Sequence, residues 1–199
     1  MPKRLFDLLC AAAGLVMLAP LLLGVALWIK LDSPGPVFFR QARVGRGGVP
    51  FRIHKFRSMR ADGPGDGGPQ LTVGADPRIT RAGRFLRRSK LDELPQLLDV
   101  LAGTMSLVGP RPEVPRYVAL YPAELRDQVL SVRPGIADPA SVERRSECDL
   151  LARAADSERI DIEQIMPAKL RCAASYVDRM SLANDVRLIG ATLRSLWAR

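Results

Sequence analysis

Two adjacent carboxylates, Asp92 and Glu93, lie in the stretch RRSKLDELPQ, directly behind a dense run of arginine and lysine. Pro95 is costly inside a helix but well tolerated at its first position. The spacing therefore favours a helix that begins near Pro95, with both carboxylates just ahead of its amino terminus. There the helix dipole and the free N–H groups stabilise ionised carboxylates and bound anions alike.

The sequence leaves two interpretations of this pair open. In the structural one, Ser89 caps the helix and Asp92 reaches back to it, as in a capping box. In the chemical one, a divalent cation or nearby arginines such as Arg87 and Arg88 balance the repulsion between Asp92 and Glu93. An ionised aspartate held beside Mg²⁺ and arginines can act as a nucleophile on a phosphorus centre.

Other cations occupy positions that suit a phosphate group. Lys55 and Arg57 alternate with apolar residues, so an extended chain places them on one face, either at a solvated strand edge or as phosphate ligands. Arg111 lies between Pro110 and Pro112, two prolines that fix the local backbone. A guanidinium presented from such a loop suits a bidentate grip on a phosphate or a carboxylate.

The composition excludes several other kinds of site. Three cysteines, Cys10, Cys148 and Cys172, are too few and too scattered for a disulfide framework or a zinc site. The lone histidine, His54, leaves no Ser-His arrangement unless it is itself the base. Metal chemistry would have to use oxygen ligands, which indicates an ion of the magnesium type.

The positive charge is concentrated in one block. Residues 30–90 hold 14 Lys or Arg and four Asp or Glu, while the whole chain has a formal net charge of +9. Such a block predicts an anionic partner: lipid headgroups, a phosphorylated substrate or nucleic acid. The alternative class of function is therefore a membrane-tethered protein that binds nucleic acid or anionic lipid. Few aromatics interleave with the charge and no nucleic-acid motif is present, which argues against nucleic acid.

An uncharged stretch of 22 residues runs from Leu8 to Ile29, and as a helix it measures about 33 Å, enough to cross the hydrocarbon core. It is too long for the apolar part of a signal peptide. Pro20 lies in its middle and tends to kink a helix. Basic residues flank both ends, and the positive-inside rule favours a cytoplasmic location for each. A plain span and a helix that enters, breaks at Pro20 and returns both stay open.

The remaining pattern predicts short elements. Two strands are expected at residues 37–41 and 51–56, around a glycine-rich loop at 44–48, and a Gly/Pro-rich loop follows at 61–68. An amphipathic helix is indicated by leucines at helical spacing: Leu91, Leu94, Leu97, Leu98 and Leu101. A last helix has an apolar face that predicts core packing or, alternatively, a membrane surface: Leu182, Val186, Ile189, Leu193, Leu196 and Trp197.

Four motifs resemble, in order and spacing, those of the bacterial sugar transferases, the monotopic polyprenyl-phosphate phosphoglycosyl transferases. They are KFRSM at 55–59, DPRIT at 76–80, LDELPQ at 91–96 and MSLVGPRP at 105–112. The resemblance covers essentially the whole chain, which looks like the minimal catalytic module of that family.

The resemblance implies a two-step reaction that starts surface polysaccharide or glycoconjugate synthesis. Asp92 would attack the β-phosphate of a nucleotide-diphospho-sugar, and polyprenyl (undecaprenyl) phosphate would then take the sugar phosphate from the aspartyl enzyme. Glu93 would bind Mg²⁺ together with Asp92 or activate the acceptor phosphate. Lys55, Arg57 and Arg111 would bind the diphosphate or buttress the site, and Arg87 and Arg88 are further candidates for phosphate binding.

The resemblance also implies a fold that is mainly α with a small β element (α+β). Residues 1–32 would form a re-entrant membrane helix broken near Pro20, and residues 33–199 a compact cytoplasmic catalytic domain with amphipathic interfacial helices. The protein is then expected on the cytoplasmic face of the bacterial inner membrane. Membrane lipids are expected partners, nucleic acid is not, and relatives favour a homodimer.

The chain departs from the family pattern near the expected site. Aligned without a gap, Arg145 falls on a family arginine and is expected to bind phosphate, but Pro139 and Ser141 replace an aromatic and an amide residue. Asp99 and Thr104 replace an asparagine and an aspartate common in relatives. The first departure affects the expected contacts to the sugar and the nucleotide, and the sequence does not identify either group. The second affects the expected surroundings of the metal.

Overall fold

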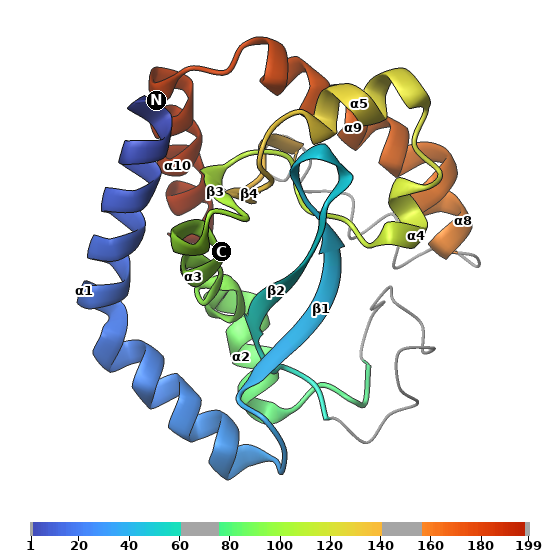
Figure 1. Cartoon of the computed structure of the whole chain (residues 1–199). Helices are drawn as coiled ribbons and strands as arrows, with labels where there is room; N and C mark the ends of the chain where they lie inside the picture. Colours follow the sequence, from blue (N-terminus) through green and yellow to red (C-terminus); the bar gives the residue numbers. More distant parts are fainter. Residues whose placement is uncertain (1, 61–75, 141–156, 198–199) are drawn as a thin grey trace.

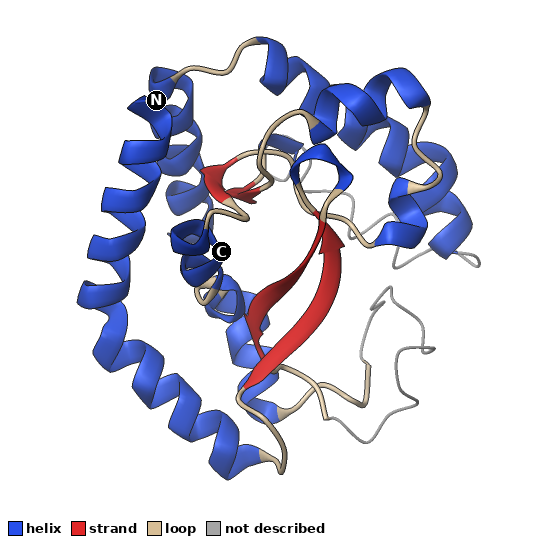
Figure 2. Ribbon diagram, in the orientation of Figure 1, coloured by secondary structure: helices blue, strands red, loops and turns tan. Residues whose placement is uncertain are grey.

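The computed structural model describes residues 2–60, 76–140 and 157–197. Most of the described residues are helical and two small sheets accompany them, which confirms the predicted mainly α fold with a small β element (Figures 1 and 2). The elements are, in chain order, α1 (Pro2–Asp32), β1 (Phe38–Val44), η1 (Arg46–Gly48), β2 (Pro50–Phe56), α2 (Arg81–Ser89), η2 (Leu91–Glu93), α3 (Gln96–Ala102), β3 (Ser106–Val108), α4 (Pro115–Val118), α5 (Ala123–Leu130), β4 (Gly135–Ala137), α8 (Ser157–Ile160), η3 (Asp161–Ile165), α9 (Met166–Asp178) and α10 (Leu182–Trp197).

The long helix α1 is, within the described residues, the one helix that is long and apolar enough to cross a membrane, judged by length and composition. Pro20 lies inside it and cannot donate a backbone hydrogen bond to the preceding turn. The helix nevertheless continues without interruption and bends about midway along its length (Figure 1). The break expected near Pro20 is therefore a bend.

One face of α1 packs on the rest of the protein and the other does not. Ala11 clusters with Leu97 of α3, and Val25 and Ile29 cluster with Leu86 of α2. The opposite face leaves large apolar side chains exposed: Leu9, Val16, Met17, Leu23, Leu27 and Leu31. The inner face of the predicted membrane segment thus shares hydrophobic clusters with the elements that follow it.

The strands β1 and β2 form an antiparallel hairpin near the centre of the molecule, with Phe38 opposite Phe56 (Figure 2). Both predicted strands are confirmed, and β1 extends further than expected. Gly47 and Gly48 have φ angles of 66° and 78°, the left-handed region that glycine adopts at low cost. The glycine-rich loop therefore allows the tight reversal between the two strands.

The short strands β3 and β4 form a parallel pair in which Ser106 lies opposite Gly135 and Val108 opposite Ala137. Their backbones approach closely at the end of β3. A Cβ atom on Gly135 would lie 2.0 Å from the backbone nitrogen of Gly109, so only glycine fits there. This contact fixes the chain where it leaves β3.

The helix α10 uses its apolar face differently from the prediction. Leu182, Val186 and Leu193 are exposed, whereas Ile189 packs against the cluster that contains Tyr176 of α9. Core packing is therefore the wrong interpretation for the three exposed side chains. The membrane-surface alternative stays a prediction.

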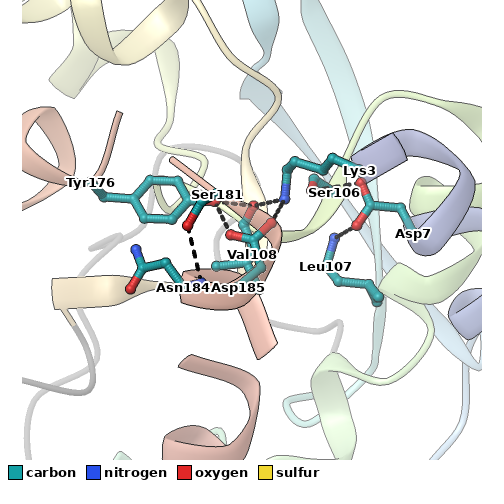
Figure 3. A network of polar contacts seen from close by, with 9 residues as sticks. All are labelled: Lys3, Asp7, Ser106, Leu107, Val108, Tyr176, Ser181, Asn184 and Asp185. Atoms are coloured by element: carbon teal, nitrogen blue, oxygen red, sulfur yellow. Dashed lines mark hydrogen bonds and ion pairs between the residues drawn. The ribbon is translucent and has the colours of Figure 1, made fainter. Parts of the chain in front are cut away.

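A network of polar contacts joins the amino end of α1 to β3, α9 and α10 (Figure 3). Lys3 Nζ donates to the carbonyl oxygen of Val108 at 3.1 Å and pairs with Oδ2 of Asp185. Tyr176 donates its hydroxyl to Oδ1 of the same carboxylate at 2.6 Å. Burial, together with the neighbouring Asp185 charge, raises the pKa of Tyr176, so the phenol keeps its proton.

Two further residues of α1 complete this attachment. Asp7 accepts from the hydroxyl of Ser106 at 2.8 Å and from the backbone N–H of Leu107 at 3.2 Å. Arg4 donates to the carbonyl oxygen of Val100 at 2.7 Å, near the end of α3. The charged residues that precede the apolar stretch therefore bind the protein itself.

Candidate active site

The two carboxylates lie on the short turn η2 between α2 and α3. Ser89 is the last residue of α2 and its hydroxyl donates to the carbonyl oxygen of Phe85 at 2.8 Å, so the capping-box interpretation is wrong. Lys90 has a φ of 59°, uncommon for a residue with a side chain, and it turns the chain into η2. The helix α3 begins at Gln96, which confirms a helix start near Pro95 with the pair just ahead of it.

Asp92 and Glu93 are buried and share one cation. Lys55 Nζ lies 3.1 Å from Asp92 Oδ2 and 3.1 Å from Glu93 Oε1, and Arg111 donates to the same Glu93 oxygen at 2.8 Å. The other oxygen of Asp92, Oδ1, is buried and has no hydrogen-bond partner within the described residues. Buried polar atoms without partners are rare and costly, and a ligand or a reacting atom at the site is one explanation for them.

The charges around Glu93 keep it ionised. Burial opposes ionisation, but the positive charges of Arg111, Lys55 and Lys90 outweigh burial and lower the pKa of Glu93 far below its ordinary value. In return, the Glu93 charge raises the pKa of Arg111. A carboxylate with so low a pKa is a weak proton acceptor and a firm anchor for cations.

Arg111 reaches the pair from the loop that follows β3. Pro110 and Pro112 restrict the backbone on either side of it. The carbonyl oxygen of Pro110 accepts from Gly135 N at 2.9 Å, and that of Pro112 accepts from the guanidinium of Arg43 at 3.1 Å. The guanidinium of Arg111 is thus presented from a loop held on both sides, as the Pro-Arg-Pro spacing predicts.

Lys55 reaches the pair from β2, and a contact that the sequence did not predict holds this strand on α3. The backbone N–H and the ring Nδ1 of His54 both bond to the Asp99 carboxylate, at 2.8 and 2.7 Å. Arg40 Nη1 lies 2.6 Å from Nε2 of the same ring. Because a guanidinium only donates, we assign Nε2 as the acceptor and place the proton on Nδ1. Both ring nitrogens of His54 are therefore bonded to residues other than Asp92 and Glu93. The one sequence feature that could have pointed to this contact is the aspartate at position 99, where relatives commonly have asparagine.

Arg57 follows the same strand but faces the end of α1. Its guanidinium donates to the carbonyl oxygens of Ser33 at 2.7 Å, Pro34 at 2.8 Å and Ile29 at 3.3 Å. Ile29 lies in the last turn of α1 and Ser33 and Pro34 follow its end, so the buried guanidinium of Arg57 caps the carboxyl end of this helix. The contacts favour the structural alternative for Arg57 over direct phosphate binding.

The remaining predicted cations are placed as follows. Arg87 and Arg88 lie in the last turn of α2, before the carboxylate pair. Lys55 and Arg111 are in hydrogen-bonding contact with the pair and Lys90 adds positive charge near Glu93, so these three cations contribute to the charge balance that was expected from Arg87 and Arg88. Arg145 and the loop 61–68 lie outside the described residues.

A metal at this place would have few protein ligands. In the described part of the chain, no group of three or more His, Cys, Asp or Glu is arranged to hold a metal ion. Mg²⁺ is commonly bound by one or two carboxylates together with substrate phosphates and water. Two adjacent carboxylates, of which Glu93 is kept ionised by its neighbours, fit that donor set, and Asp92 and Glu93 are the residues that would hold the ion.

Comparison with known proteins agrees with the motifs. Residues 1–199 match the family described as bacterial sugar transferase. A UDP-glucose:undecaprenyl-phosphate glucose-1-phosphate transferase of Caulobacter vibrioides is 40% identical over 198 residues, 98% of this chain and 69% of the relative. The exopolysaccharide production protein PSS of Rhizobium leguminosarum is 42% identical over 203 residues, 99% of this chain and 96% of the relative.

A further relative is much longer than this chain. It is a UDP-N-acetylgalactosamine-undecaprenyl-phosphate N-acetylgalactosaminephosphotransferase of Aeromonas hydrophila, 40% identical over 196 residues. The chain spans 43% of that protein, so its match is to one part of it. With a family match over every residue and relatives at 40% identity or more, the chain belongs to the bacterial sugar transferase family.

Proposed function

We propose that this protein transfers a sugar 1-phosphate from a UDP-sugar to undecaprenyl phosphate and so starts the synthesis of a surface polysaccharide or glycoconjugate. The support is its family and the names of its relatives, which pair a UDP-sugar with undecaprenyl phosphate. Those names divide between glucose and N-acetylgalactosamine, so the proposal is for a donor class and not for one sugar.

The observation that carries the mechanism is the unpaired Oδ1 of Asp92. In the first step, this oxygen attacks the β-phosphorus of the donor while the bond to the α–β bridging oxygen breaks, and UMP leaves with that electron pair. In the second step, a phosphate oxygen of the acceptor attacks the same phosphorus and the Asp92 carboxylate leaves. Two displacements suit a soluble donor and a lipid acceptor, because the substrates need not meet.

The charged residues beside Asp92 suit binding and neutralisation of the phosphates in the proposed reaction. Glu93 is ionised and bound to Lys55 and Arg111, so we assign it to holding cations around the phosphates, and not to removing a proton from the acceptor. Lys55 and Arg111 would neutralise the charge that develops on the transferred phosphoryl group. Bound Mg²⁺, held by Asp92 and Glu93, would supply further charge neutralisation at the diphosphate.

We further propose that α1 enters the membrane and returns to the side on which it began. Its amino end is bound to β3 and α10 through Lys3 and Asp7, and its carboxyl end is bound through Arg57. Both ends therefore contact one body of protein, which is difficult to reconcile with ends on opposite sides of a bilayer. With the bend near Pro20, this supports a re-entrant segment 1–32 and a cytoplasmic part 33–199 at the bacterial inner membrane. A homodimer stays a prediction.

Donor-only trapping tests the nucleophile. Purified protein is incubated with Mg²⁺ and UDP-glucose or UDP-N-acetylgalactosamine without acceptor, and its intact mass is measured. We expect one sugar phosphate per chain, on Asp92, together with UMP release. The adduct should be absent in Asp92→Asn and present in Asp127→Asn, a change at a side chain that is 78% exposed. Transfer to undecaprenyl phosphate without any adduct would refute the covalent step.

Cysteine labelling tests the topology. In a variant with Cys10, Cys148 and Cys172 replaced by serine, single cysteines are introduced as Pro2→Cys and, on the exposed hairpin, as Val49→Cys. A membrane-impermeant reagent should label both from the same side of sealed vesicles. Labelling from opposite sides would establish a plain span.

A further inference from the structure

The cations of the basic block, residues 30–90, differ in whether the fold gives them partners. Several of its cations are bound within the protein, among them Lys55, Arg57 and Arg43. On α2, by contrast, Arg81 and Arg84 are exposed, and neither guanidinium makes a hydrogen bond or ion pair within the described residues. Positive charge at these positions is therefore not explained by the fold.

The helix α2 has two sharply different faces. Ala82 and Leu86 are fully buried, and Gly83 packs so closely that a Cβ there would lie 2.0 Å from the carbonyl oxygen of Ser58. The opposite face carries residues at helical spacing, all exposed, which we call the arginine face of α2: Arg81, Arg84, Phe85 and Arg88. The helix itself contains no acidic residue that could balance Arg81 and Arg84.

The arginine face adjoins the end of the apolar helix. Phe85 is 51% exposed and its ring lies 5.5 Å from that of Trp28, which is 40% exposed on α1. Trp28 stands at the end of the uncharged stretch, where tryptophan is typical of the membrane–water interface. The side chain of Asp32, one turn further on, accepts from the backbone N–H of Ala82 at 3.0 Å and fixes α2 at this level.

We propose that the arginine face of α2 binds the headgroups of anionic phospholipids around the point where α1 leaves the membrane. The membrane placement rests on the proposed function, while the choice of anionic headgroups rests on the charge of this face. Headgroup phosphates carry the charge opposite to that of the arginines. The Trp28–Phe85 pair beside them provides an aromatic surface of the kind found at the membrane–water interface. The surface would recruit anionic lipid beside the site that receives a lipid phosphate.

Tryptophan quenching in lipid nanodiscs tests this proposal. In a Trp197→Phe background Trp28 is the single tryptophan, because the chain has two. Nanodiscs contain phosphatidylcholine and phosphatidylglycerol with one or the other brominated on its acyl chains. We expect brominated phosphatidylglycerol to quench Trp28 more than brominated phosphatidylcholine at equal mole fraction, with the preference reduced by high salt.

Substitutions test whether the preference for phosphatidylglycerol depends on Arg81 and Arg84. Arg81→Gln with Arg84→Gln should lower the relative affinity for phosphatidylglycerol by about fivefold for each arginine removed. Arg81→Lys with Arg84→Lys should keep it, because the charge is retained. Arg52→Gln with Arg171→Gln removes the same charge from two exposed arginines on β2 and α9 and should also keep it.

Three results would overturn the proposal. The first is equal quenching by the two lipids in the parent protein. The second is an equal loss of preference in both glutamine double variants, which would indicate bulk charge only. The third is binding of single-stranded DNA that depends on Arg81 and Arg84 without any lipid preference. Sugar-phosphate transfer measured in phosphatidylcholine nanodiscs is a separate readout, so the lipid preference can fail while the proposed activity stands.

Discussion

Two pairs of buried acidic residues in this protein differ in how their oxygens are satisfied. Asp7 and Asp185 are 2% and 0% exposed, and Asp92 and Glu93 are 3% and 8% exposed. Both oxygens of Asp7 and both of Asp185 have partners (Figure 3). In the second pair, one oxygen of Asp92 has none within the described residues.

The difference teaches that burial alone does not mark a reactive carboxylate. A buried carboxylate with every lone pair engaged stabilises the fold and specifies one arrangement of its neighbours. A buried carboxylate with an unpaired oxygen beside cations is maintained at a cost in stability, which is a property of sites that act on a ligand. Substitutions in the two pairs should therefore separate activity from stability.

Asp92→Asn is expected to have the largest effect on activity. Removal of a nucleophile costs enzymes about 10⁴-fold or more in kcat, so turnover should fall to background. The melting temperature in detergent should change by no more than about 2–4 °C, because the lost contact is one ion pair and the unpaired charge is removed with it. Turnover is read as UMP release and stability by thermal unfolding, with Asp127→Asn as the exposed control.

Asp185→Asn should show the opposite pattern. The change leaves Lys3 without its counter-charge and weakens the Tyr176 contact, and loss of one partner of a buried ion pair costs about 3 kcal/mol. Adding Lys3→Met should restore part of the stability, because the uncompensated charge is removed. Below the lowered melting temperature, kcat should stay close to that of the parent. Loss of turnover without loss of stability would contradict the structural role.

Glu93→Gln sharpens the comparison through pH. The folded-state pKa of Glu93 is lowered, so ionised Glu93 stabilises the fold above its unfolded pKa of about 4.3, and this contribution is lost as pH falls toward the folded value. At neutral pH the variant should melt at least about 4 °C lower than the parent, because Glu93 is buried and its loss leaves the charges of Lys55 and Arg111 uncompensated. The gap should close as pH falls below about 4.3. If the difference in melting temperature between the parent and Glu93→Gln grew as pH fell, the pKa of Glu93 would be raised in the folded state, and the assignment of a lowered pKa would be refuted.

Local sequence patterns predicted the backbone around the carboxylate pair better than the contacts between distant residues. The helix start near Pro95 and the loop around Arg111 follow from local proline rules, and both are present. The two strands and the glycine-rich loop between them follow from local composition, and both strands are present. Local patterns suffice where the backbone conformation of a few neighbouring residues decides the outcome.

Other features depend on contacts between distant residues, which no local pattern contains. Arg57 and Lys55 have the same charge and lie two positions apart, yet one binds the end of α1 and the other the carboxylate pair. Ser89 had the spacing of a helix cap, but a left-handed Lys90 ends α2 behind it. The exposure of Leu182 and its neighbours on α10 depends on what covers that helix, which its own periodicity does not specify.

Asp99→Asn should have the smallest effect and tests the contact that the sequence missed. An asparagine keeps an oxygen for the backbone N–H of His54, but its amide group favours an unprotonated Nδ1. The ring proton would then move to Nε2, where it faces the guanidinium of Arg40 and breaks that contact. We expect a loss of about 1 kcal/mol in stability and a fall of no more than about tenfold in kcat/KM, through a less well held Lys55. His54→Gln, which removes the ring, should lose at least as much stability. A fall in the turnover of Asp99→Asn as large as that of Asp92→Asn would instead place Asp99 inside the reacting centre, which would contradict the structural role assigned to it.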